Sequence, residues 1–196
     1  MAFSTNDFVF YFKLGWEHII SADALDHQLF IAALAAVYVF KDVRQVLILV
    51  TAFTIGHSLT LVLSVLDIIR FSSKWVEFLI PCTIIITAIN NLCNLNNIGQ
   101  SRRFNYYFAM GFGLIHGMGF ANAVRIMLAQ DETLGLGLFG FNVGLEAGQI
   151  AVVVALLLVT KIALNNLNIL RRDWVFFLSS GVFALSLKMA VERWPH

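Results

Sequence analysis

The chain has 196 residues, of which 59% are hydrophobic and only 13% are charged, and its formal net charge is +1. Soluble domains contain about a quarter charged residues, so this composition excludes an ordinary soluble protein and indicates a polytopic membrane protein. The near-neutral charge gives no reason to expect a nucleic-acid partner.

Six membrane spans follow in chain order from the rule that about 20 apolar residues make one span. They cover residues 22–40, 46–69, 75–95, 104–128, 136–162 and 174–192. The aromatic N-terminal segment is expected to lie at the membrane interface. Because the first span is short, residues 8–20 should form a helical or re-entrant lead-in packed against it. We therefore predict an all-α membrane helix bundle, with residues 1–196 in a single domain.

The distribution of lysine and arginine predicts the orientation of the bundle. With six spans, the first, third and fifth loops share one side, and they hold most of the basic loop residues: Lys41, Arg44, Arg102, Arg103, Arg171 and Arg172. The opposite side carries Lys13, Arg70, Lys74 and Arg193, together with the acidic Asp131 and Glu132. The positive-inside rule then places both termini outside. We expect an integral protein of a bacterial inner membrane.

Ionisable residues interrupt several of these apolar stretches. Asp23, Asp26 and His27 stand at positions i, i+3 and i+4 near the start of the first span, with His18 just before it. His57 lies in 45–66, which contains no Asp, Glu, Lys or Arg. His116 lies within 104–124 and Glu146 within 133–160. Each such group costs roughly 2.5–3.5 kcal/mol at membrane depth, so their convergence predicts a site for a cation or a proton.

The chemistry of these side chains favours a metal. Imidazole and carboxylate together suit divalent first-row transition metals. Cys82 and Cys93 are not placed to contribute, which argues against a closed structural zinc site. The polar residues of the third span, Thr83, Thr87, Asn90 and Asn94, are expected to form interhelical hydrogen bonds. The Gly113–Gly117 pair should allow close helix packing beside His116.

Four ordered motifs resemble the signature blocks of the HupE/UreJ membrane proteins: GWEHIISADALDHQLF, AFTIGHSLTL, FGLIHGMGFA and FNVGLEAGQ. The resemblance extends from about Leu14 to Glu146 and beyond. The family is associated with nickel and cobalt uptake, and its histidine- and acid-bearing blocks are presumed to handle the metal. Carried over, the resemblance implies these metal-handling residues: His18, Asp23, Asp26, His27, His57, His116 and Glu146.

The leading functional interpretation is transport of a divalent transition-metal ion, nickel or cobalt first. The alternative is an intramembrane zinc-dependent hydrolase acting on a lipid or peptide, with Asp26 or Glu146 as general base. A metal sensor or a subunit of a complex is the third interpretation. Besides lipid and metal, the small size leaves room for a homo-oligomer or a membrane partner.

Overall fold

The computed structural model describes residues 5–98, 105, 108–119 and 134–195, and every regular element within them is helical. The labelled α-helices are α1 (Thr5–Ile20), α2 (Leu25–Ala35), α3 (Val43–Val65), α4 (Ser73–Cys93), α6 (Leu134–Asn165) and α7 (Arg171–Glu192). Two short 3-10 turns, η1 (Ala22–Ala24) and η2 (Phe40–Asp42), flank α2. One further helix covers Phe108–Gly119.

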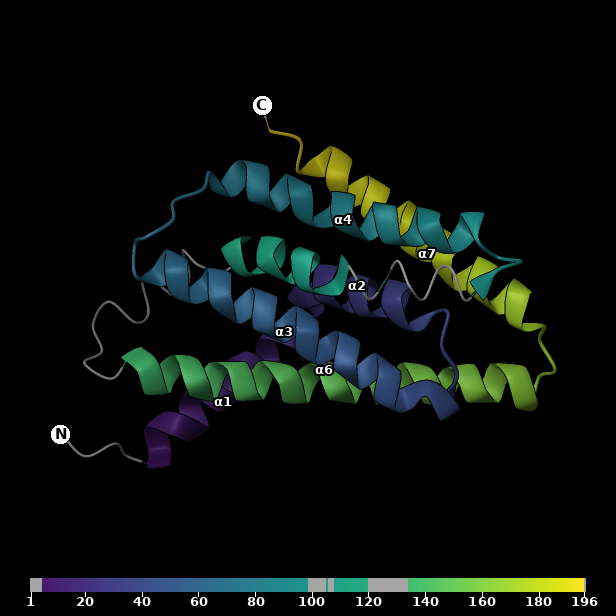
Figure 1. Cartoon of the computed structure of the whole chain (residues 1–196), viewed down its shortest axis with the longest axis horizontal. Helices are drawn as coiled ribbons and strands as arrows, with labels where there is room; N and C mark the ends of the chain where they lie inside the picture. Colours follow the sequence, from purple (N-terminus) through teal and green to yellow (C-terminus); the bar gives the residue numbers. More distant parts are fainter. Residues whose placement is uncertain (1–4, 99–104, 106–107, 120–133, 196) are drawn as a thin grey trace.

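Four helices in the described residues are long and apolar enough to cross a membrane, namely α3, α4, α6 and α7. They run along the long axis of the molecule in Figure 1. This arrangement confirms the predicted all-α membrane bundle. Within the fourth predicted span, only Asn105 and the Phe108–Gly119 helix are described, and the remainder of 104–128 lies outside the described residues.

The first predicted span, 22–40, contains a short helix rather than a full crossing. α2 has 11 residues and is therefore about 16 Å long, roughly half of the ~30 Å hydrocarbon core. α1 ends at Ile20, and η1 joins the two helices. The amide of Gln28 donates to the carbonyls of Ile19, Ile20 and Ser21 at 3.1, 3.3 and 2.9 Å. These bonds satisfy the carbonyls at the end of α1 and fix the break.

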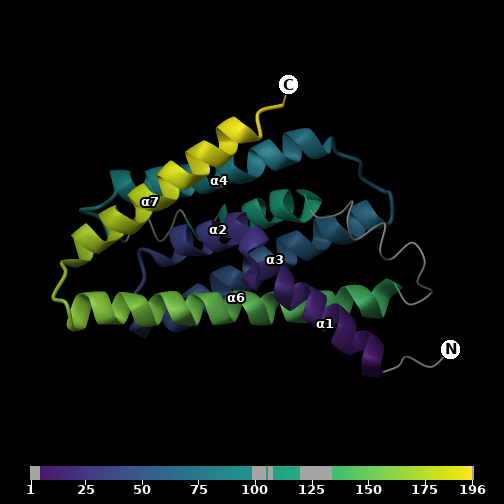
Figure 2. The ribbon, with the colours of Figure 1, turned by 180° about the vertical axis from the view of Figure 1, so that it is seen from behind.

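α1 packs along α6, and Figure 2 shows the two helices crossing. Glycines permit the contact: a Cβ at Gly15 would collide with the carbonyl of Phe141, and one at Gly144 with the carbonyl of Phe12. We predicted that residues 8–20 would pack against the first span, but α1 touches α2 far less than it touches α6. The glycines of α6 explain the difference, because they offer a flat backbone surface that α2 lacks.

The Phe108–Gly119 helix packs backbone to backbone against α3. A Cβ at Gly113 would collide with the carbonyl of Phe53, and one at Gly117 with the carbonyl of His57. From the other side, Gly56 faces the carbonyl of Met110. The close packing expected of the Gly113–Gly117 pair is therefore present, and it brings His116 beside α3.

Two arginines mark opposite ends of the bundle. Arg193, just after α7, donates to Asp26 at the start of α2 at 3.2 Å. Arg171, at the start of α7, donates to the carbonyl of Val37 after α2 at 2.7 Å. The link that contains Lys41 therefore lies at the Arg171 end. The Arg193 end contains the site described next.

Candidate metal centre

Four histidines from four different helices meet inside the bundle. They are His18 of α1, His27 of α2, His57 of α3 and His116 of the Phe108–Gly119 helix. His27 lies at the centre: its ring centroid is 4.8 Å from that of His18, 5.9 Å from His57 and 5.2 Å from His116. Three of the four side chains are buried, and His57 has no exposed surface. The cluster is therefore an interior feature, built by contacts between helices that are distant in sequence.

The spacing of the nitrogens approaches that of a metal site. One ring nitrogen from each of His18, His27 and His57 lies within 4.8 Å of the others. Three imidazole nitrogens evenly spaced around one zinc-sized ion at 2.0–2.1 Å lie about 3.5 Å apart. Side-chain rotations that move each nitrogen by about 0.7 Å would bring the three within that range. These histidines can therefore converge on one ion without a change in the helix packing.

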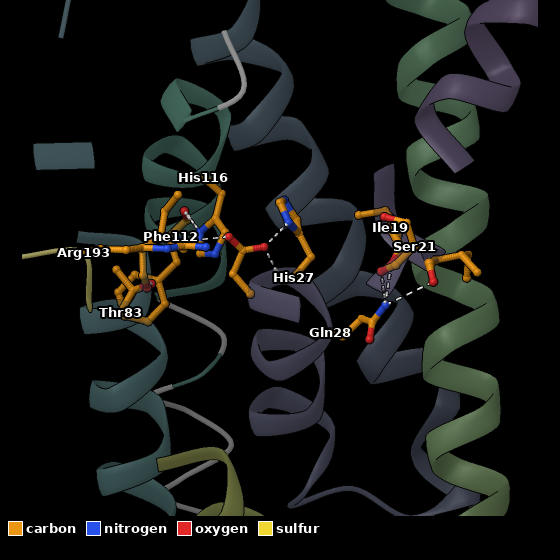
Figure 3. Close-up of polar contacts among 11 residues, drawn as sticks. Ile19, Ser21, His27, Gln28, Thr83, Phe112, His116 and Arg193 are labelled. Carbon is orange, nitrogen blue, oxygen red and sulfur yellow. Dashed lines mark hydrogen bonds and ion pairs between the residues drawn. The ribbon is translucent and has the colours of Figure 1, made fainter. Parts of the chain in front are cut away.

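Hydrogen bonds select which nitrogen of two rings faces the centre (Figure 3). His27 Nδ1 lies 2.9 Å from Asp26 Oδ1, and His116 Nδ1 lies 2.9 Å from the carbonyl oxygen of Phe112. Both oxygens are acceptors, so each Nδ1 carries the proton and each Nε2 keeps its lone pair. Metal-binding histidines are commonly oriented in this way by a carboxylate or a backbone carbonyl.

The remaining ring nitrogens of His27, His57 and His116 have no hydrogen-bond partner in the part of the chain that the structure describes. Among the described residues, His27 Nε2, His116 Nε2 and both ring nitrogens of His57 are buried without a hydrogen bond. Each buried polar atom of this kind costs about 1–3 kcal/mol. Aromatic rings enclose them further, with Phe30 and Phe53 centred 5.2 and 5.0 Å from the ring of His116. This arrangement fits a bound cation, which would satisfy the lone pairs directly.

A cavity of about 330 Å³ leads from the Arg193 end of the bundle to the cluster. Its lining includes three of the histidines, His18, His27 and His116. Three carboxylates and one guanidinium also line it: Asp23, Asp26, Glu77 and Arg193. Asp23 is exposed, whereas the carboxylate of Asp26 is only 13% exposed. The cavity is therefore acidic and has histidines among its lining, a combination that attracts cations.

A family comparison agrees with this geometry. The family model described as HupE / UreJ protein matches residues 2–193, nearly the whole chain. The chain belongs to the HupE/UreJ family. That family is associated with nickel and cobalt transport. No curated protein and no solved structure matches the chain.

Within this HupE/UreJ chain, the structure does not bring Glu146 together with the histidines. The Glu146 carboxylate accepts a hydrogen bond from Thr51 at 2.7 Å, in a separate groove that Thr54 and Ser58 also line. The reason is rotation about the axis of α6. Glu146 follows Gly144 by two residues, which is about 200° around the helix. Since Gly144 faces α1, Glu146 points away from α1 and from His18.

Two residues outside the predicted set, Gln28 and Arg193, shape the centre. Gln28 fixes the end of α1 and hence the position of His18, but nothing about a glutamine beside a histidine indicates this. The sequence indicates only a loop charge at Arg193, whereas in the structure Arg193 contacts Asp26.

The sequence predicts interhelical hydrogen bonds for the polar residues of α4, but Thr83, Thr87 and Asn94 donate to carbonyls of α4 itself, at 2.7, 3.0 and 2.8 Å. The interhelical bond comes instead from Asn91, which is not in the predicted set and donates to the carbonyl of Ala33 at 2.7 Å.

Proposed function

We propose that this protein transports a divalent transition-metal ion, nickel or cobalt, through the histidine centre. The observation that carries the proposal is the convergence of nitrogens from His18, His27 and His57 within 4.8 Å. Membership of the HupE/UreJ family supports the same conclusion. The metal is the cargo in this proposal. His116, from the Phe108–Gly119 helix, completes the set of ligands.

The donor set is suited to that cargo. Imidazole nitrogens bind nickel, cobalt and zinc better than they bind magnesium or calcium, which prefer oxygen. Cys82 and Cys93 both lie on α4, and neither belongs to the group of candidate ligands found in the described residues. A site without thiolates holds these metals less tightly, which suits an ion that must be released again.

The cavity gives the ion a way in. Asp23 and Glu77 contribute negative charge to its lining, which also contains Asp26 in contact with His27. We propose that this cavity opens to the outside of a bacterial inner membrane, with both termini outside. The basic residues Lys41 and Arg171 at the opposite end of the bundle support this orientation.

The outer surface of the bundle is strongly apolar. Phe139, Phe176 and Phe177 are 60%, 54% and 68% exposed in the single chain. We propose that lipid covers most of this surface and that a second copy or a membrane partner covers part of it. Chemical cross-linking in native membranes tests the second half of that statement.

Metal flux into proteoliposomes tests the proposed function. Purified protein should give saturable uptake of Ni²⁺ or Co²⁺. The variant His57→Ala/His116→Ala should take up the metal at least about tenfold more slowly. The matched control, Cys82→Ala/Cys93→Ala, should transport normally, because it changes two side chains outside the centre. Absence of saturable flux in the unmodified protein would contradict transport. Tightly bound zinc together with lipid hydrolysis would favour the intramembrane hydrolase.

A further inference from the structure

Two serines of α7 have no explanation in the packing of the bundle. Ser179 and Ser186 are fully buried, and their hydroxyls have no hydrogen-bond partner among the described residues. A serine or threonine hydroxyl in a helix commonly donates to a carbonyl three or four residues earlier. Thr87 does so on α4, at 3.0 Å. A buried hydroxyl without a partner costs about 1–3 kcal/mol, so these two positions indicate a ligand that the protein itself does not supply.

The serines lie on the face of α7 that leads inward from the cavity. Ser179, Ser186 and Arg193 are separated by seven residues, which is two helical turns, so they share one face. Each step along this face is about 10 Å. Since Arg193 lines the cavity and contacts Asp26, the same face continues from the cavity to Ser186 and then to Ser179.

Helix α4 presents matching polar groups. Thr83, Thr87 and Asn91 follow one another at four-residue spacing, and all three are buried. Ile80, three residues before Thr83 and on the same face of α4, lines the cavity, so this polar row also begins at the cavity. Because Asn91 donates to the carbonyl of Ala33, the row ends against α2.

A shared apolar cluster shows that α2, α4 and α7 face one another. It contains Ala33 of α2, Ile84 and Ala88 of α4, and Val182 and Met189 of α7. These residues alternate along the helices with the buried threonines and serines. The polar groups therefore form a seam between three packed helices, and they do not face lipid.

We propose that this α2–α4–α7 seam, defined by Thr83, Thr87, Asn91, Ser179 and Ser186, is the path by which the ion leaves the histidine centre. The inference rests on the proposed transport function. Neutral oxygens bind first-row transition metals more weakly than imidazole does. Conduction needs such weak successive sites after a selective one. The apolar side chains of Ile84 and Val182 narrow the seam, so passage requires the contact between α4 and α7 to loosen.

Cysteine accessibility tests the seam directly. In a Cys82→Ala/Cys93→Ala background, single variants Ser179→Cys and Ser186→Cys are reconstituted in proteoliposomes and treated with a permanently cationic methanethiosulfonate. Leu157→Cys is the matched control, because Leu157 is fully buried on α6, in an apolar cluster outside the seam. Water in the seam should make both serine-derived thiols react about tenfold faster than the control, since thiolates form only in a polar environment. Modification of Ser186→Cys should also block Ni²⁺ uptake.

The outcomes separate this inference from the proposed function. If both serine-derived thiols react no faster than Leu157→Cys while Ni²⁺ uptake continues, transport stands and the path lies elsewhere. Fast reaction of both serine-derived thiols, with Ni²⁺ uptake blocked after modification of Ser186→Cys, supports the seam as the exit path. Ser186→Thr, which keeps the hydroxyl, should retain more uptake than Ser186→Val, which has a similar size and no oxygen. Equal uptake by these two variants would also overturn the inference.

Discussion

Arg193 and His27 share one carboxylate. Asp26 Oδ2 accepts from Arg193 Nη1 at 3.2 Å, and Asp26 Oδ1 lies 2.9 Å from His27 Nδ1. The three residues come from the end of α7 and the start of α2, and the guanidinium is the most exposed of them, at 30%. A positive charge that belongs to the protein is therefore tied to the histidine centre at the point where a cation would arrive.

Replacing Arg193 by glutamine should tighten metal binding. The guanidinium repels an arriving divalent cation and neutralises part of the charge of Asp26, so its removal should lower the dissociation constant by about threefold to tenfold. Isothermal titration of detergent-solubilised protein with Ni²⁺ measures this. Arg193→Lys, which keeps the charge, should bind as the unmodified protein does. Weaker binding by Arg193→Gln would show that the arginine mainly holds Asp26 in place.

Asp26→Asn should weaken metal binding by about 10–100-fold, because a carboxylate that orients a metal-binding histidine contributes about that much. The amide keeps the size of the side chain but loses the charge that polarises His27. Asp23→Asn is the matched control. Asp23 is exposed, and no hydrogen bond to a histidine is found for it among the described residues. The metal affinity of the Asp23→Asn variant should therefore change far less than that of Asp26→Asn. Equal losses in the two variants would mean that only the overall charge of the cavity matters.

Gly113→Ala should destabilise the protein and weaken metal binding together. The added Cβ collides with the backbone of Phe53, which forces the Phe108–Gly119 helix away from α3 and moves His116. Overpacking of this kind costs about 1–3 kcal/mol. Gly111→Ala is a strong control: nothing lies within 4 Å of the added methyl, and alanine favours the helix by roughly 1 kcal/mol. Thermal unfolding in detergent should give a lower Tm than that of the unmodified protein for Gly113→Ala and a higher Tm for Gly111→Ala.

Glu146→Gln should leave metal affinity at the histidine centre within about twofold of the original, because distant sites rarely couple. Its carboxylate bonds to Thr51 in a groove separate from the cavity. Elemental analysis of the purified variant gives the metal content. A fall to less than half of the stoichiometry would place Glu146 in the metal centre after all.

The sequence predicted the membrane bundle and the meeting of four histidines because both depend on one-dimensional properties. Long apolar runs predict the spans, and the depths of His57 and His116 along their helices allow them to meet. The prediction included Glu146 because its depth was suitable. Depth does not specify the direction of a side chain, and the glycine surface around Gly144 turns Glu146 away from the other groups.

The lead-in helix shows a second limit. The sequence predicts a lead-in over 8–20 followed by a separate span from residue 22, but it does not predict the partner of α1. That partner depends on the contact of Gly15 with the backbone of Phe141, which lies over a hundred residues later in the chain. The pattern of residues within one helix does not indicate which distant helix it packs against. The Arg193–Asp26 pair was missed for the same reason.

The ligands of the bound ion test the central claim most directly. X-ray absorption at the nickel edge, measured on Ni²⁺-loaded protein, should show an inner shell dominated by imidazole nitrogen. His27→Ala/His57→Ala should lose both that signature and the bound ion. An oxygen or sulfur shell in the unmodified protein, or the same nickel content and spectrum in the double variant, would contradict the histidine centre.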